Sequence, residues 1–165
     1  MELFDAHAHL ASADFTGDLP AVLARAEAVG VCGIVAVGET LEEGQAILAL
    51  ASRHPLIKPA AGLYPTNLDP EAADAVVGCI RAHADRLVAV GEVGLDHWVV
   101  KDEVEWKVQE EILGKFVAVS NELRLPLNVH SRSAGRHTIA FLRAPGVPPS
   151  RDGFPRARAR SRRAE

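Results

Sequence analysis

The sequence predicts an α/β fold built from repeating strand–helix units. Short apolar runs alternate with longer amphipathic stretches, and the short runs are rich in Val, Ile, Leu and Ala, as expected of parallel strands buried on both faces. The chain has 165 residues, of which 48% are hydrophobic and 24% charged, a composition that excludes collagen-like and coiled-coil proteins. The length suits one domain but is short of the roughly 250 residues of an eight-stranded β/α barrel.

Five predicted strands alternate with four predicted helices. The strands are Glu2–Ala8, Val31–Val37, Ile57–Leu63, Leu87–Gly91 and Pro126–His130. The helices between them are Gly17–Val29, Leu41–Arg53, Pro70–Asp85 and Glu103–Leu123, and a fifth predicted helix contains His137. This order is typical of the first part of a β/α barrel or of an open α/β sheet.

Local signals support the helix assignments. Asp69 is a good N-cap for the helix that begins at Pro70, because proline fits the first helical turn. Apolar and weakly polar side chains then recur with helical spacing at Ala72, Ala75, Val76, Cys79, Ile80 and His83. The last long helix has a similar stripe, weakened by one internal glycine, at Val108, Ile112, Phe116 and Val119.

The charge distribution divides the chain into two parts. Residues 1–142 carry 11 Lys+Arg against 20 Asp+Glu, a balance of −9. Residues 143–165 carry 7 Arg against two acidic residues, a balance of +5, together with four prolines and no apolar periodicity. We therefore expect a folded domain over 1–142 and a basic, disordered tail over 143–165. The tail is expected to be a solvated segment, and the alternatives are a phosphate contact or a nuclear import signal.

The two cysteines and the N-terminus favour an intracellular protein. Cys32 and Cys79 are 47 residues apart and belong to no CxxC motif, which favours reduced thiols over a disulfide. The first residues lack the basic and apolar regions of a signal peptide, and no stretch approaches the ~18 apolar residues of a membrane span. The expected location is cytoplasmic or, through the basic tail, nuclear, with no membrane partner.

The segment from Asp5 to His9 carries the first chemical signal. Because alternate side chains of a strand share a face, Asp5, His7 and His9 point the same way. The opposite face is apolar, because it consists of Phe4, Ala6, Ala8 and Leu10. We therefore expect it to pack under helices. Two imidazoles and a carboxylate on one face are costly in a core, and a divalent metal ion would remove that cost. The alternative is a pair of surface histidines at a strand end.

Two more ligand types lie at the ends of later predicted strands. Glu92 follows the predicted strand 87–91, and His130 ends the predicted strand 126–130. In β/α proteins the carboxyl ends of the strands form the site, and His7 and His9 also lie at such an end. Alone, Glu92 would be a solvated loop carboxylate and His130 a hydrogen-bonded core histidine. Together with the HxH pair they favour a divalent-metal centre, and these ligand types suit Zn, Mn and, less well, Mg.

Three segments resemble the signature segments of the TatD family of metal-dependent hydrolases. They are FDAHAHL, AVGEVGLDH and LRLPLNVHSRSAGR, and the third is similar to the TatD domain-containing 3 branch of the family. The similarity extends from residue 2 to about residue 142. It implies a TIM-type β/α barrel, of which about five of the eight βα units are present, with one or two divalent ions at the strand ends. It also implies deoxyribonuclease activity on DNA, as an exonuclease or an abasic-site endonuclease.

The resemblance assigns the metal ligands. His7 and His9 match the ligands of the first strand. Glu92 matches a carboxylate that can bridge two metals, and His130 matches a ligand of the second metal.

The resemblance also assigns supporting and substrate-binding residues. Arg132 lies in the HSR segment, where a guanidinium can bind a phosphate group with two hydrogen bonds. Arg132 and the metal-bridging Glu92 are therefore the expected catalytic residues. Asp5 precedes the HxH pair and is expected to orient a ligand from behind it. Asp96 is expected to support the same rim, with a simple loop cap as the alternative.

The sequence departs from the family pattern at several points. The family carries a further histidine in an HxF-type segment on the next strand and a catalytic aspartate on the last strand, and neither is found in these 165 residues. His137 lies in a predicted helix, where it would not replace them, and Tyr64 stands where family members commonly have histidine. The change in composition after Leu142 is typical of a frame shift or an alternative splice end, so we expect a C-terminally truncated isoform.

These departures leave four interpretations open. The favoured one is a TatD-type hydrolase, with activity at least about a hundredfold below that of a complete relative, because a positioned base contributes roughly 10²–10⁴ in rate. The chain could instead be a non-catalytic metal-binding isoform or an unstable fragment. An amidohydrolase-like barrel acting on C–N bonds is disfavoured, because such proteins often have a carboxylated lysine where this chain has Glu92. Five strands leave open sheet edges, which predicts self-association.

Overall fold

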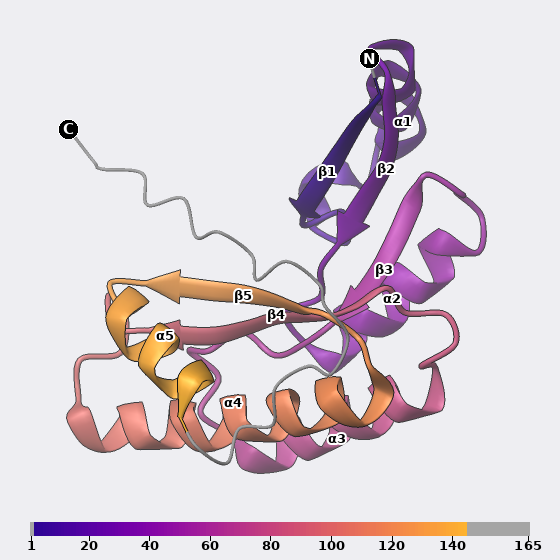
Figure 1. Ribbon diagram of the computed structural model, residues 1–165. Coiled ribbons are helices and arrows are strands. Elements are labelled where there is room, and N and C mark those ends of the chain that lie inside the picture. The colour runs from indigo at the N-terminus through magenta and orange to yellow at the C-terminus, as the bar shows by residue number, and fades with distance from the viewer. Residues whose placement is uncertain (1, 145–165) are drawn as a thin grey trace, which may run out of the picture.

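The computed structural model describes residues 2–144, which form five strands and six helical segments (Figure 1). The strands are β1 (Leu3–Ala8), β2 (Val31–Ala36), β3 (Ile57–Ala61), β4 (Ala89–Asp96) and β5 (Leu127–Arg132). The helices are α1 (Leu19–Ala28), α2 (Leu41–Ala51), α3 (Pro70–Ala82), α4 (Glu103–Leu123) and α5 (Gly135–Arg143), with a short 3-10 helix, η1 (Ala13–Phe15), before α1.

The strands form one parallel sheet in the order β1-β2-β3-β4-β5, so each strand pairs with the next one along the chain. This is the arrangement of consecutive units of a β/α barrel, and it confirms the predicted fold class. The sheet curls strongly. Its curl is evident from a hydrogen bond between the two end strands, which the Asn128 side chain on β5 donates to the carbonyl oxygen of Ala6 on β1 at 2.8 Å. The two end strands therefore meet through a side chain.

The helices cover the outer face of the sheet and provide most of its core. The larger cluster joins α3 and α4 to β4, and its most buried large side chains are Phe116, Ile80, Leu95, Leu113, Val76 and Val93. A second cluster joins α1 and α2 to β2 and β3 through Leu23, Ile34, Ile47 and Ile57. Each of these side chains contributes roughly 1.5–3 kcal/mol on burial, so the two clusters hold the helices to the sheet.

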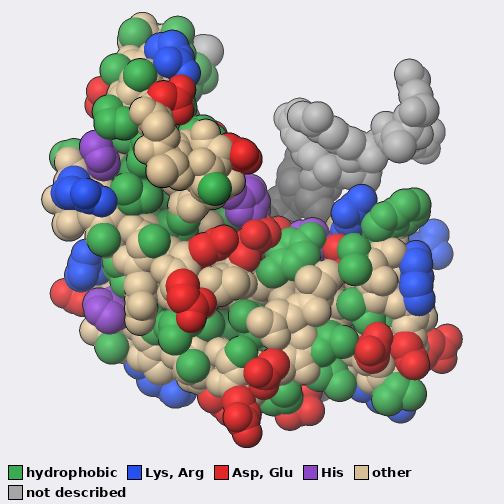
Figure 2. All heavy atoms as spheres, turned by 180° about the vertical axis from the view of Figure 1, so that it is seen from behind, with side chains coloured by type: hydrophobic (Ala, Val, Ile, Leu, Met, Phe, Trp, Pro, Cys, Tyr) green, Lys and Arg blue, Asp and Glu red, His purple; other side chains and the backbone are tan. Residues whose placement is uncertain are grey.

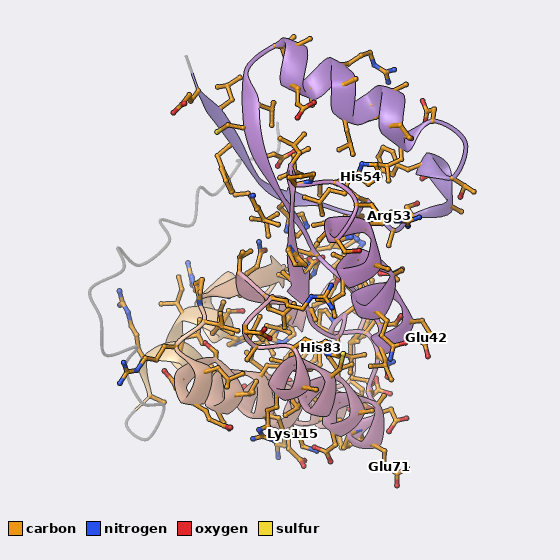
Figure 3. The ribbon with its side chains drawn as sticks, turned by 90° about the vertical axis from the view of Figure 1, so that its right-hand side faces the viewer. Glu42, Arg53, His54, Glu71, His83 and Lys115 are labelled. Atoms are coloured by element: carbon orange, nitrogen blue, oxygen red, sulfur yellow. The ribbon has the colours of Figure 1, made fainter. Side chains whose placement is uncertain are left out.

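Ion pairs between α3 and α4 add to this packing. Lys115 on α4, labelled in Figure 3, lies 2.8 Å from Asp74 and also donates to the carbonyl oxygen of Pro70. Arg81 binds both oxygens of Glu122. These groups are largely exposed, and such pairs contribute only about 0.2–1 kcal/mol each. They fix the alignment of the two helices more than they stabilise the fold.

The structure corrects the predicted end of the fourth strand. The sequence pattern placed it at Gly91, whereas β4 continues to Asp96, so Glu92 lies within the strand and not after it. The glycines in this strand permit a close approach to β5. A Cβ atom at Gly94 would overlap the carbonyl oxygen of His130, and one at Gly91 would lie 2.5 Å from that of Asn128. The strand β5 likewise continues two residues beyond its predicted end, to Arg132.

The outer face of β1 also differs from the prediction. Of the apolar side chains expected under helices, Leu10 is buried, but Phe4 is 57% exposed and lies against Gly33 of β2. The cause is the position of β1 at the end of the sheet, where no helix of residues 2–144 covers that part of its face. Self-association through this edge remains a prediction, which light scattering on the purified chain would test.

Two further expectations concern the basic tail and membrane-spanning helices. Most of the predicted basic tail, from residue 145 onward, lies outside the described residues, and α5 ends at Arg143. Within residues 2–144, none of the helices combines the length and the apolar character needed to cross a membrane.

Candidate metal centre

Three side chains from β1 and β4 converge at one end of the sheet. His7 and His9 are two residues apart at the end of β1, so both imidazoles point to the inner face, as the alternation of side chains predicts. Their Nε2 atoms lie 3.1 Å apart, and Glu92 Oε2 lies 3.5 Å from His7 Nε2 and 3.4 Å from His9 Nε2. The three ligand atoms therefore form a nearly equilateral triangle.

The dimensions and the chemistry of this triangle fit a divalent ion. Two ligand atoms bound at 2.0–2.1 Å to a tetrahedral ion lie roughly 3.3 Å apart, close to the separations found here. Glu92 is only 4% exposed, and its Oε2 atom is buried without a hydrogen-bond partner among the described residues. A buried, unpaired carboxylate oxygen is costly, and a cation between it and two imidazoles would satisfy it.

A glutamate–histidine pair extends the centre to β5. His130 Nδ1 lies 2.7 Å from Glu92 Oε1, and His130 Nε2 lies 3.1 Å from Asp96 Oδ2. Burial alone would lower the pKa of His130, but its hydrogen bonds and attraction to the two carboxylates outweigh burial and raise it. Burial correspondingly favours raised pKa values for Glu92 and Asp96, yet contacts with His130 and, for Asp96, two backbone amides lower both.

His130 thus lies between two carboxylates, an arrangement that favours its protonated form. Both of its ring nitrogens are engaged, and it is not part of the triangle formed by His7, His9 and Glu92. It touches the opposite oxygen of the same glutamate, so the carboxylate of Glu92 faces the triangle with one oxygen and His130 with the other.

Asn128 fixes the orientation of His7. Its amide nitrogen donates to Ala6 on β1, so its amide oxygen faces the ring and lies 2.9 Å from His7 Nδ1. An oxygen at this position requires a proton on Nδ1, which leaves the lone pair of Nε2 free for a metal ion. This residue was not predicted from the sequence, because its role depends on the curl that brings β5 to β1.

Replacing Asn128 by leucine is expected to weaken divalent-ion binding about 10–100-fold, because His7 loses the hydrogen bond that sets its tautomer. Zinc and manganese titration of both proteins would measure the change. Among residues 2–144, the side chain of Asn121 bonds only to the carbonyl oxygen of Val117 on its own helix, so Asn121→Leu supplies the matched control. An Asn128→Leu protein with unchanged affinity would contradict the assigned role.

Asp96 links the centre to the loop that follows β4. One oxygen faces His130, and the other accepts the backbone N–H groups of Trp98 and Val99, both at 2.8 Å. Buried Gln109 of α4 donates to the carbonyl oxygens of Pro65 and Asp96 and accepts the N–H of Asp96. The contacts of Asp96 with Trp98 and Val99 are those of a loop cap, and its support of the metal rim remains a prediction.

The remaining expected residues take up distinct positions. Asp5 accepts a hydrogen bond from the backbone N–H of His7 at 3.0 Å, so it supports the strand and not the imidazole. Arg132 lies two residues beyond His130 on β5, with its guanidinium carbon 5.5 Å from the Trp98 ring centroid. His137 lies in α5, where its Nδ1 is 3.1 Å from Nδ1 of His97.

Two more residues at the centre were not assigned a role from the sequence. Tyr64 donates to Asp96 Oδ2 at 3.4 Å and packs edge-on against the His130 ring, with centroids 4.9 Å apart. Glu39 follows β2 and lies 3.9 Å from His9 Nδ1, an atom with no hydrogen-bond partner among the described residues. Burial, only partly offset by His9, raises the pKa of Glu39. The position of Glu39 just after the predicted strand 31–37 was the sequence signal that could have identified it as a residue of the site.

The surface view places this chemistry in context. Histidine and carboxylate side chains gather where the arm formed by β1, β2 and α1 joins the rest of the molecule (Figure 2). His7 and His9 lie on the solvent side of this region, with 39% of each side chain exposed, and Glu92 lies buried beneath them. The geometry can hold a divalent ion beside an open surface.

Comparison with known proteins is consistent with this chemistry. The family model described as TatD related DNase matches residues 4–153. The human protein named Deoxyribonuclease TATDN3 is 37% identical over 158 residues, covering 88% of this chain and 57% of that protein. The protein named 3'-5' ssDNA/RNA exonuclease TatD of Salmonella typhimurium is 32% identical over 146 residues, covering 85% of this chain and 54% of that protein.

A solved structure shares the same architecture. The crystal structure of YJJV, a TatD homologue from Escherichia coli, matches with a TM-score of 0.76 and 28% identity, covering 85% of this chain and 54% of that one. The chain spans about half the length of the curated relatives it matches.

Proposed function

This chain belongs to the TatD-related DNase family, and from that premise we propose that its metal centre hydrolyses phosphodiester bonds of DNA. The observation that carries the proposal is the unpaired Oε2 atom of Glu92, buried and directed at the Nε2 atoms of His7 and His9. A bound divalent ion supplies Lewis-acid chemistry there, lowering the pKa of water and neutralising charge on a phosphate.

The side chains of the chain would divide the remaining work. His7, His9 and Glu92 hold the first ion, with Asn128 keeping the His7 lone pair directed at it. A second ion would bind Glu92 Oε1 and His130 after His130 loses its proton and the hydrogen bond between these two side chains opens. The sequence leaves Zn, Mn and Mg open, because imidazole and carboxylate ligands accept all three to different degrees.

Arg132 would bind the phosphate group. It follows His130 at a spacing of two residues, so both side chains leave β5 on the same face. A guanidinium can donate two parallel hydrogen bonds to a phosphate and so align the ester for attack. Glu92 and Arg132 are thus the proposed catalytic residues.

Cleavage of labelled single-stranded, duplex, abasic and RNA oligonucleotides in Mn²⁺, Mg²⁺ or Zn²⁺ would test the proposal. We expect divalent-dependent cleavage of DNA that falls at least about 100-fold in Glu92→Gln, since the variant loses the charge at the centre. Glu122→Gln is the matched control, because Glu122 is an exposed carboxylate paired only with Arg81. Equal rates in wild type and Glu92→Gln would refute the proposal.

A second candidate is a non-catalytic metal-binding protein. It is favoured by the contacts of His130, whose two ring nitrogens face Glu92 and Asp96, so that among the described residues the triangle of His7, His9 and Glu92 offers ligand atoms for one ion. Stoichiometric metal without any cleavage would establish the second candidate and exclude the first.

A further inference from the structure

The loop after β4 presents a large aromatic side chain to solvent beside two cations. Trp98 is 56% exposed, although it is among the residue types with most to gain from burial. Lys101 Nζ lies 4.9 Å and Arg132 Cζ lies 5.5 Å from the centroid of its ring. Cation–π attraction at exposed sites contributes only ~0.5–1 kcal/mol, so these contacts do not by themselves account for an exposed indole.

The backbone that carries Trp98 is firmly anchored. Asp96 accepts the N–H groups of Trp98 and Val99 at 2.8 Å each, and the indole of Trp106 donates to the carbonyl oxygen of Val100 at 2.9 Å. The neighbouring His97 is buried and stacked on Trp106, with ring centroids 4.0 Å apart. The indole of Trp98 therefore projects from a fixed loop, as a binding platform requires.

The same anchor connects Trp98 to the metal centre. The Asp96 carboxylate that holds the loop also contacts His130, whose other nitrogen contacts Glu92. Arg132 reaches the indole from the strand that carries His130. The indole, the two cations and the metal ligands thus belong to one continuous edge of the sheet.

We propose that Trp98 is a stacking platform for an unpaired base of single-stranded DNA, with Lys101 and Arg132 binding the phosphates that flank that base. The proposal rests on the function proposed above and names the side chain that would contact the strand beside the metal centre. Every base has a π-face, and stacking on an aromatic side chain contributes about 1–3 kcal/mol per base. Bases inside a duplex are already stacked and do not offer that face, which favours single strands over duplex.

The binding of two fluorescent oligonucleotides to the full chain, without added metal, tests the platform. One is a thymidine decamer and the other has the same phosphates but abasic sugars. Wild type is expected to bind the thymidine strand about 5–150-fold more tightly, the ratio that corresponds to one stacked base. Trp98→Ala is expected to lose that ratio, while Trp98→Phe retains most of it.

Two controls separate stacking from charge and from general damage. Lys101→Gln is expected to weaken the binding of both strands equally and to reduce the salt dependence by about one phosphate contact. Phe4→Ala removes another exposed aromatic, on the far side of β1 from the metal ligands, and is expected to leave the ratio unchanged.

The outcomes distinguish this inference from the proposed function. Equal affinity of wild type for both strands, a ratio that persists in Trp98→Ala, or no binding of either strand overturns the platform. A ratio that depends on Trp98 in a protein that never cleaves DNA supports the platform and refutes only the proposed catalysis.

Discussion

Replacing His7 or His9 by alanine is expected to abolish tight binding of divalent ions. Each variant leaves two of the three ligand atoms that now lie 3.1–3.5 Å apart, and Glu92 Oε2 loses one of the two imidazoles it faces. The loss should exceed the 10–100-fold effect typical of residues that only orient a ligand. Wild type is expected to retain at least one ion per chain and the variants almost none.

Metal analysis of the monomeric fraction after size exclusion measures this directly. His54→Ala is the matched control, because His54, labelled in Figure 3, lies between the end of α2 and the start of β3, whereas His7 and His9 lie at the carboxyl end of β1. Full occupancy in the His7→Ala protein would exclude the assigned centre. Absence of metal from wild type would exclude it as well.

Replacing Gly94 by alanine is expected to destabilise the fold by about 3 kcal/mol or more. The added Cβ would overlap the carbonyl oxygen of His130, which is backbone and cannot rotate away, so β4 and β5 must separate. Gly78→Ala is the matched control: nothing lies within 4 Å of its added Cβ, and alanine in the middle of α3 should stabilise by roughly 0.5–1 kcal/mol.

Urea unfolding of both glycine variants gives the comparison. The expected result is a midpoint well below wild type for Gly94→Ala and slightly above it for Gly78→Ala. If the two variants unfold at the same urea concentration, the close contact of β4 with β5 does not exist in solution.

The sequence predicted those elements whose ends are marked by local chemistry. The helix α4 has its predicted bounds, because Asp102 caps its first turn through the N–H of Val104 and Arg124 ends it in a left-handed conformation. The predicted end of β4 at Gly91 was wrong because the apolar run is interrupted there, whereas the strand continues with Gly91 and Gly94 close against the backbone of β5. Only the pairing with β5 shows that β4 continues past its glycines.

The candidate site divides in the same way. The shared face of His7 and His9 follows from the period of a strand and was predicted. The roles of Asn128 and Gln109 depend on which backbone atoms the curled sheet and α4 bring near them, and no local pattern carries that information. A metal-ligand role for His130 remains a prediction, because the described contacts pair it with Glu92 and Asp96.

The amide of Asn128 couples ion binding to the curvature of the sheet. It joins residues 121 positions apart, bonding the backbone of β1 with one end and the ring of a metal ligand with the other. By thermodynamic linkage, an ion that prefers this arrangement stabilises it by about 2.7 kcal/mol when its concentration is 100 times its dissociation constant. Amide hydrogens of β5 should then exchange more slowly in the presence of the ion, although the triangle itself contains no residue of that strand. Within residues 2–144, β1 and β5 should in this sense respond to the ion together, because the side chain of Asn128 joins them.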